Sequence, residues 1–141
     1  MLALEDLSGW GESEVIAHLI NSYSGDVSGF GYGDPNESDF KIAEDKLANM
    51  EVLIAYESVG SWGCDSTSFF LLRNKETGNL YEIYGGHCSC YGFEGQLDLE
   101  ETDLKTLQYR INSGGGVFCH GGYDSNENEN TKQVNEYILN M

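Results

Sequence analysis

The feature that most constrains the fold is a series of three apolar runs of strand length in the middle of the chain. They span residues 51–56, 66–73 and 79–84. Between the second and third runs, residues 74–78 read Asn-Lys-Glu-Thr-Gly, a short polar loop that ends in glycine. Such a loop is typical of a β-hairpin that needs one left-handed residue. The three runs therefore predict an antiparallel meander.

Apolar residues at helical spacing lie on both sides of these strands. We expect one helix over residues 12–23 and a second that begins at Asn36 or Ser38. A third helix is expected around Leu104, Leu107 and Ile111. The residues expected at its ends are Thr102 as its cap, Glu100, Glu101 and Asp103 at its acidic start, and Gly114, Gly115 and Gly116 as its stop.

The last part of the chain predicts a fourth strand and a fourth helix. Residues 117–120 have the composition of a short strand, and Thr131 is placed to cap a C-terminal helix. Residues 124–130 are rich in Asn and Glu and are expected to form a mobile linker. The chain of 141 residues has the length of one domain, residues 1–141. We predict an α+β fold with an antiparallel sheet of three or four strands and three to four flanking helices.

The sequence predicts a protein of the cytosol. No apolar run approaches the ~20 residues that cross a bilayer. The first six residues, Met-Leu-Ala-Leu-Glu-Asp, lack the basic start and apolar stretch of a signal peptide. In that compartment four cysteines indicate reduced thiols or a metal site rather than disulfides.

The charge of the chain restricts its partners. Its Asp and Glu residues number 24 and its Lys and Arg residues 7, for a net charge of −17. Such a surface repels nucleic acid and anionic lipid, so direct binding to DNA or to a membrane is not expected. It attracts proteins with basic grooves, although negative charge also serves solubility alone. The acidic residues that we select for partner binding are Glu44, Asp45, Glu100, Glu101 and Asp103.

One cysteine-histidine cluster has three interpretations. In the first, Cys88 and Cys90 are small buried residues of a glycine-rich loop. In the second, both bind structural zinc together with Cys119 and His120, although the Cys-x-Cys and Cys-His spacings differ from a repeated Cys-x-x-Cys. In the third, one thiolate is a nucleophile. In the zinc interpretation, Cys64 and His87 are possible further ligands. In the nucleophile interpretation, His87 or His120 is the base and Glu94 is the acid that orients it.

Other signatures of enzymes are absent from the sequence. It has no phosphate-binding glycine loop with a lysine, no His-Glu-x-x-His and no Gly-x-Ser-x-Gly. Residues 29–33 alternate glycine with Phe30 and Tyr32, which either anchor a protein partner or close over the core. His18 lies beside the apolar face of the first helix and is expected to be partly buried. No catalytic residue is therefore predicted.

Residues from Glu51 to about Leu107 resemble small proteins of unknown function encoded by bacteriophages and prophages. The resemblance rests on the apolar strands, on Leu-Tyr-Glu at 80–82, and on the segment 86–96, Gly-His-Cys-Ser-Cys-Tyr-Gly-Phe-Glu-Gly-Gln. It implies a phage product that acts in a bacterial cytosol. It carries no activity over to this chain.

Charge and resemblance together predict an inhibitor of the anti-restriction or anti-CRISPR kind. Such a protein binds and blocks a host nucleic-acid-handling enzyme, foremost a defence nuclease, through a carboxylate-rich surface that mimics DNA. The alternative is a small zinc-binding structural or interaction protein, and a third hypothesis is a cysteine-dependent enzyme. We expect no cofactor other than structural zinc.

Overall fold

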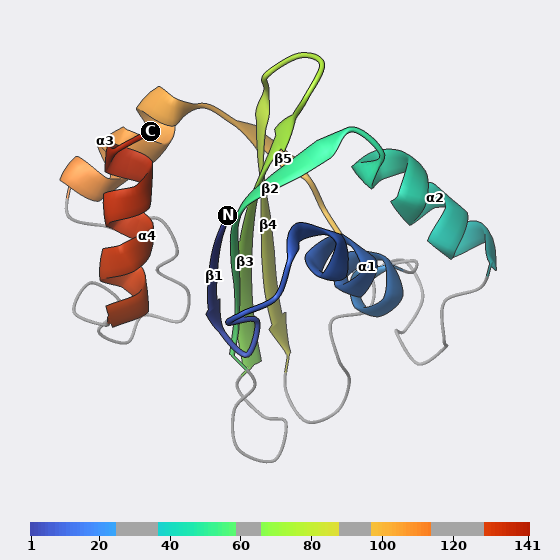
Figure 1. Cartoon of the computed structure of the whole chain (residues 1–141). Coiled ribbons are helices and arrows are strands. Elements are labelled where there is room, and N and C mark those ends of the chain that lie inside the picture. Colours follow the sequence, from blue (N-terminus) through green and yellow to red (C-terminus); the bar gives the residue numbers. More distant parts are fainter. Residues whose placement is uncertain (25–36, 59–65, 88–96, 114–128) are drawn as a thin grey trace.

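The computed structural model describes residues 1–24, 37–58, 66–87, 97–113 and 129–141. Within these residues the chain forms one five-stranded sheet, in the order β1-β2-β3-β4-β5, and four helices. Helices α1 and α2 cover one face of the sheet and α3 and α4 cover the other (Figure 1). The elements are β1 (Leu2–Glu5), α1 (Glu12–Tyr23), α2 (Glu37–Leu47), β2 (Met50–Ser58), β3 (Ser66–Asn74), β4 (Leu80–His87), β5 (Glu100–Thr102), α3 (Leu104–Asn112) and α4 (Glu129–Leu139).

The predicted meander is confirmed by strands β2, β3 and β4, which pair antiparallel in sequence order. In the β3–β4 hairpin, Gly78 has a φ of +79°, the left-handed conformation expected for it. The Asn74 side chain accepts hydrogen bonds from the backbone N–H groups of Glu76 and Thr77, at 2.8 and 3.1 Å. The loop is thus stabilised by its own asparagine.

The α+β class is confirmed, but the prediction of three or four antiparallel strands is wrong, because the sheet is mixed and has five strands. Strand β1 pairs parallel with β2, with Leu2 opposite Ile54. Parallel neighbours need a long crossover, which α1 and α2 provide here. Strand β5 pairs antiparallel with β4 and covers residues expected to begin a helix. Both added strands are too short to give a periodic signal.

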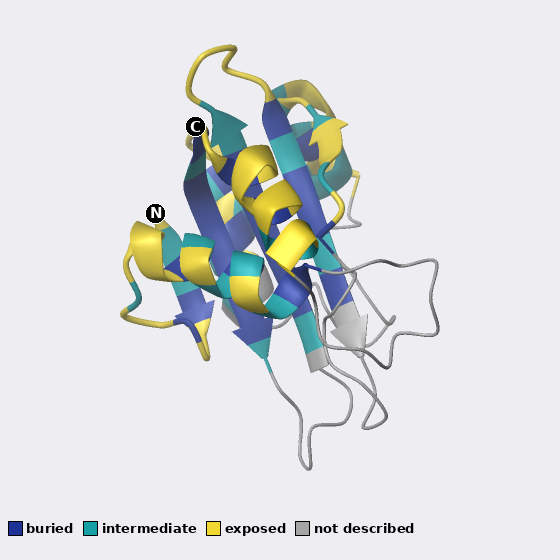
Figure 2. Cartoon of the chain, turned by 90° about the vertical axis from the view of Figure 1, so that its right-hand side faces the viewer, coloured by how far each residue is buried: buried dark blue, intermediate teal, exposed yellow. Residues whose placement is uncertain are grey.

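Both faces of the sheet are covered, which explains why the centres of β2 and β3, residues 52–56 and 69–72, are continuous apolar runs. Phe70 and Ile83 pack toward α1 and α2, whereas Phe69 and Leu71 pack toward α3 and α4. The β2–β3 register shifts between Val52 and Ile54. Figure 2 shows buried strands beneath helices whose outer sides are exposed.

The structure confirms the first predicted helix and corrects the starts of two others. Helix α1 has the predicted bounds, residues 12–23. Helix α3 is capped by Asp103 and not by Thr102, because the Asp103 side chain accepts a hydrogen bond from the backbone N–H of Thr106. Helix α4 begins at Glu129, inside the expected linker, so Thr131 is not its cap.

The expected strand at 117–120 and residues 124–128 of the expected linker lie outside the described residues. Within the described part of the chain, no helix combines the length and apolarity needed to cross a membrane.

Candidate functional site

Four carboxylates follow one another along an edge of the sheet. Strand β5 pairs with β4 on one side, with Glu100 opposite Glu82 and Glu101 opposite Tyr81. Glu100 and Glu101 are exposed, as are Asp98 before the strand and Asp103 after it. We call Asp98, Glu100, Glu101 and Asp103 the acidic edge. Charges on an edge strand also prevent a further strand from pairing with it.

Asp103 has a structural role as well as its charge. Its side chain accepts the backbone N–H of Thr106 at 2.7 Å and so caps α3. This hydrogen bond lowers the pKa of the Asp103 carboxyl, and nearby Lys105 lowers it further. The contribution of this group to stability is therefore complete above the ordinary pKa of Asp and is lost as the pH falls from there through the lowered pKa.

The other two selected carboxylates lie on α2. Glu44 and Asp45 are both exposed, and Asp45 forms an ion pair with Lys41, whose Nζ lies 3.5 Å from Asp45 Oδ1. Lys41 and Lys46 lie on the same helix, so α2 has a smaller net negative charge than the acidic edge.

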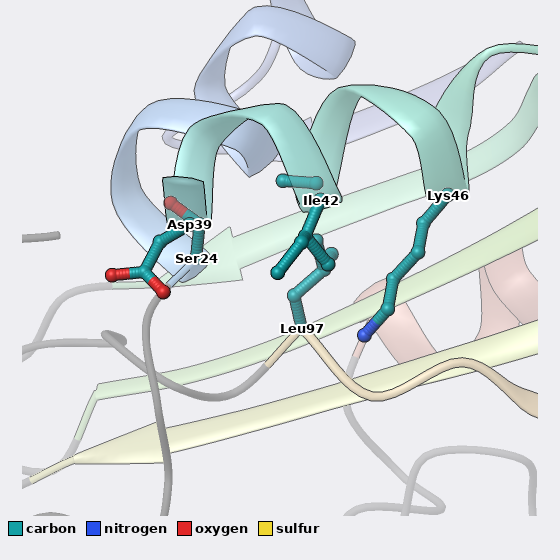
Figure 3. Close-up of a pocket in the computed structure, with 6 residues that line it drawn as sticks. Ser24, Asp39, Ile42, Lys46 and Leu97 are labelled. Carbon is teal, nitrogen blue, oxygen red and sulfur yellow. The ribbon is translucent and has the colours of Figure 1, made fainter. Parts of the chain in front are cut away.

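Helix α2 borders the segment that leads into the acidic edge. Figure 3 shows Ile42 and Leu97 pointing toward one another, between Asp39 and Lys46. These side chains line a small hollow of about 50 Å³. Leu97 is also tied to the end of α1 by a hydrogen bond from its backbone N–H to the Tyr23 carbonyl, at 3.1 Å. Helix α2 therefore lies beside the residue that precedes Asp98, the first residue of the acidic edge.

Both arginines of the chain are held by carboxylates. Arg73 contacts Glu51 at 2.6 Å and Arg110 contacts Glu82 at 2.6 Å. The exposed charges of the described residues are then dominated by acids. The exposed acidic residues are Glu5, Asp6, Glu12, Glu14, Glu37, Glu44, Asp45, Glu76, Asp98, Glu100, Glu101, Asp103 and Glu136, and the exposed lysines are Lys41, Lys46, Lys75, Lys105 and Lys132.

A buried glutamate joins β2 to α1. Glu57 accepts hydrogen bonds from the Tyr23 hydroxyl at 2.6 Å and from His18 Nε2 at 2.8 Å. The His18 side chain is 20% exposed, which confirms the prediction of partial burial, and its ring contacts Trp10 edge to face. Burial, and then the charge of Glu57 and its hydrogen bond, raise the pKa of Tyr23. The hydroxyl therefore stays protonated and continues to donate.

His18 also contacts Ser22, whose hydroxyl lies 3.3 Å from Nδ1. When the imidazole is neutral, Nε2 donates to Glu57 and Nδ1 accepts from Ser22. Ser22, His18 and Glu57 are thus connected in the order of the nucleophile, base and acid of a catalytic relay. Ser22 lies in the last turn of α1, however, where the helix dipole is negative and opposes an oxyanion. We therefore interpret these contacts as structural ones that hold α1 against β2.

A second buried glutamate joins β4 to α3. Glu82 accepts hydrogen bonds from Arg110 and from the Tyr84 hydroxyl, and Arg110 also donates to that hydroxyl at 3.0 Å. Burial, and then the hydrogen bond and charge of Glu82, raise the pKa of Tyr84. Burial alone lowers the pKa of Arg110, but Glu82 and Tyr84 more than offset this and raise it. Tyr84 and Arg110 are thus held in their ordinary charge states.

The two raised tyrosine pKa values predict a loss of stability in alkali. Above about pH 10 the tyrosines of the unfolded chain lose protons that Tyr23 and Tyr84 keep when folded. The folded state then binds more protons, so the free energy of unfolding falls as the pH rises. Urea denaturation at several pH values from about 8 to 11 measures this slope. The variant Tyr23→Phe/Tyr84→Phe should show a shallower slope, and an equal slope would contradict the assignment.

Sequence reasoning selected the carboxylates but missed both buried glutamate clusters. Cys64, Cys88, Cys90, Cys119 and His120 lie outside the described residues, as do Phe30, Tyr32 and Glu94. His87 ends β4, and only its place in the strand is described. Among the residues that are described, no group of three or more His, Cys, Asp or Glu side chains could hold a metal ion.

Comparisons of the chain with protein-family models, with curated proteins and with solved structures find no match.

Proposed function

We propose that the chain is a phage-type acidic inhibitor that binds the basic nucleic-acid groove of a host protein, foremost a defence nuclease, without catalysing a reaction. The observation that carries the proposal is the acidic edge, a row of exposed carboxylates on an extended part of the backbone. The net charge of −17 supports it, because opposite charge accelerates encounter with a basic groove.

The spacing of the charges supports mimicry of a nucleic-acid strand. An extended chain rises about 3.3 Å per residue, so the segment from Asp98 to Asp103 spans about 17 Å. Its four carboxylates divide that length into three intervals of about 6 Å on average, compared with one phosphate per ~3.4 Å along a DNA strand. Neighbouring side chains of an extended strand point to opposite sides, so on each side two carboxylates lie about 7 Å apart, near the spacing of every second phosphate. A groove that places Lys and Arg side chains along a phosphate row can meet one such pair.

The buried clusters support a binding role over a catalytic one. Glu57 and Glu82 have the burial expected of functional acids, but each is occupied by donors from its own fold. Exposed carboxylates such as Glu100 and Glu101 are then the groups that can meet a partner.

Substitutions that remove two carboxylate charges test the role of the acidic edge. The variant Glu100→Gln/Glu101→Gln removes two charges and keeps the shape of the side chains, and Asp103 is left to cap α3. Tagged protein is used to capture partners from the lysate of a bacterial host at low and at high salt. We expect a nucleic-acid-binding protein to be captured at low salt by the wild type and about tenfold less by the variant, the result of two lost ion pairs.

The matched control is Glu76→Gln/Glu136→Gln, which removes two exposed charges from the β3–β4 hairpin and from α4. It should capture the partner nearly as well as the wild type. Equal losses in both variants would mean that only the total charge matters. Capture that high salt does not reduce would contradict the proposed mechanism.

A further inference from the structure

Helix α4 is attached to the rest of the fold by few contacts. It lies beside β1 and α3 (Figure 1). Among its described side chains only Val134 and Ile138 are fully buried, in the apolar cluster that contains Leu4 of β1. Tyr137 packs against the same cluster but is only partly buried. From α3, the Gln108 side chain donates a hydrogen bond to the Ile138 carbonyl at 3.3 Å.

Helix α1, on the other face of the sheet, is attached more firmly. Val15, Leu19 and Tyr23 are fully buried. Its first residue, Glu12, accepts a hydrogen bond from the backbone N–H of Val52 at 2.7 Å, and the buried glutamate of β2 holds its last turns. Local opening of a folded protein begins where buried contacts and hydrogen bonds are fewest. We therefore expect α4 to open more readily than α1.

The sequence of α4 gives the helix little stability of its own. Six of its 11 residues are β-branched, aromatic or Asn residues of low helix propensity, namely Asn130, Thr131, Val134, Asn135, Tyr137 and Ile138. Its last turn has no basic residue to compensate the helix dipole. A helix of this length is marginal in water even with a better sequence. Its stability therefore depends on its docking contacts.

One buried polar atom of α4 lacks a hydrogen bond in the docked position. The side-chain oxygen Oδ1 of Asn135 is shielded from solvent, and no donor among the described residues reaches it. A buried acceptor without a donor is unfavourable, because water satisfies the same atom once it is exposed. The docked arrangement thus contains an unfavourable contribution that opening removes.

The start of α4 is fixed by a residue with a strained backbone. Glu5, the last residue of β1, has a φ of +55°, a left-handed conformation that residues other than glycine rarely adopt. Its carboxylate accepts a hydrogen bond from the Asn130 side chain at 2.5 Å. Asn130 is the second residue of α4, so the carboxylate also lies near the positive end of the helix dipole. These favourable contacts exist only while α4 is docked.

We propose that α4 is a detachable helix, anchored at its start by Glu5, which leaves the sheet as a unit while α1 and strands β2, β3 and β4 stay folded. Opening lets water reach Asn135 and uncovers part of the apolar cluster around Leu4. The closed protein hides this surface and the open form presents it. The inference does not depend on the proposed function, because none of these residues belongs to the acidic edge.

Native-state hydrogen exchange, followed by NMR on the full chain at several low urea concentrations, tests the opening of α4. We expect the amides of α4 to exchange at least about 100-fold faster than those of β3, and the amides of α1 to exchange at rates closer to those of β3. The exchange of α4 should depend only weakly on urea, because its opening exposes little surface. Amides of α4 that exchange at the rate of β3, with the same urea dependence, would overturn the proposal.

The variant Asn135→Leu removes the unsatisfied oxygen and keeps the size of the side chain. It should slow the exchange of α4 at least about tenfold, because the docked helix no longer contains a buried acceptor without a donor. The matched control is Asn21→Leu, the same substitution at an exposed position of α1, which should leave the exchange of α4 unchanged. The proposal fails if Asn135→Leu and the wild type exchange alike.

The variant Glu5→Ala tests the anchor. Loss of the hydrogen bond to Asn130 and of the charge near the helix start should make the exchange of α4 about fivefold faster. Glu76→Ala removes an exposed carboxylate from the β3–β4 hairpin and should leave α4 as in the wild type. Unchanged exchange of α4 in Glu5→Ala would show that the carboxylate does not hold the helix, and the anchor would be disproved.

Discussion

Replacing Arg110 with methionine is expected to lower the free energy of unfolding by about 2–4 kcal/mol. The Glu82 side chain is 5% exposed, and Arg110 holds it at 2.6 Å. Methionine keeps much of the aliphatic stem but leaves a buried carboxylate with the Tyr84 hydroxyl and without its cation. Because Arg110 itself is 33% exposed, solvent screens part of the interaction, and the loss is smaller than for a fully buried pair. Urea denaturation measures the change.

Arg73→Met is the matched control. Its pair with Glu51 has the same distance, 2.6 Å, but the two side chains are 42% and 32% exposed. Exposed pairs contribute about 0–1 kcal/mol, so this variant should be close to the wild type. A third variant, Glu82→Leu/Arg110→Met, removes both charges and should recover part of the stability. Equal losses for the two arginines would contradict the assignment of Arg110 as a structural cation.

Replacing Glu57 with alanine is expected to lower the free energy of unfolding by about 2–4 kcal/mol. The substitution takes the carboxylate away from the Tyr23 hydroxyl, which lies in a fully buried residue, and leaves a cavity between α1 and β2. Tyr23→Phe removes only the hydroxyl, and Glu57 keeps its hydrogen bond to His18. We therefore expect about 1 kcal/mol for that variant.

A double-mutant cycle shows whether the two groups act through each other. If Glu57 and Tyr23 stabilise the fold mainly by their shared hydrogen bond, Glu57→Ala/Tyr23→Phe should lose less than the sum of the single losses. The phenylalanine no longer has a buried hydroxyl to satisfy. Additive losses would mean that the Glu57 effect comes from the cavity and the lost contact with His18, and not from the hydrogen bond to Tyr23. The measurement is again the urea dependence of unfolding, under identical conditions for all four proteins.

The central strands could be predicted from the sequence, whereas the edges of the sheet could not. Residues 52–56 and 69–72 are apolar throughout because both faces of the sheet are covered, and such runs are easy to recognise. In β1 only Leu4 is buried, and its parallel partner β2 is separated from it by two helices. Strand β5 consists of Glu-Glu-Thr, a composition that favours a helix start over a strand.

The exposed part of the candidate site was also predictable, but the buried clusters were not. Acids that pair with no cation among the described residues, such as Glu44 and Glu100, lie on the surface because burial of a charge without a partner is costly. Glu57 and Glu82 are buried because partners reach them from 39 and 28 residues away, His18 and Arg110. The available signal was an acidic residue at the end of an apolar strand or within one. Nothing local in the sequence identifies which cation or hydroxyl will meet it.

The most direct test of the acidic inhibitor is competition between this protein and duplex DNA for the captured partner. The partner is first bound to tagged wild-type protein at low salt, and duplex DNA is then added in increasing amounts. If the acidic edge occupies a nucleic-acid groove, the DNA should displace the partner, and the protein should in turn inhibit the partner's binding or cleavage of DNA. If the partner binds the protein and DNA at the same time, with its activity unchanged, the central claim is contradicted.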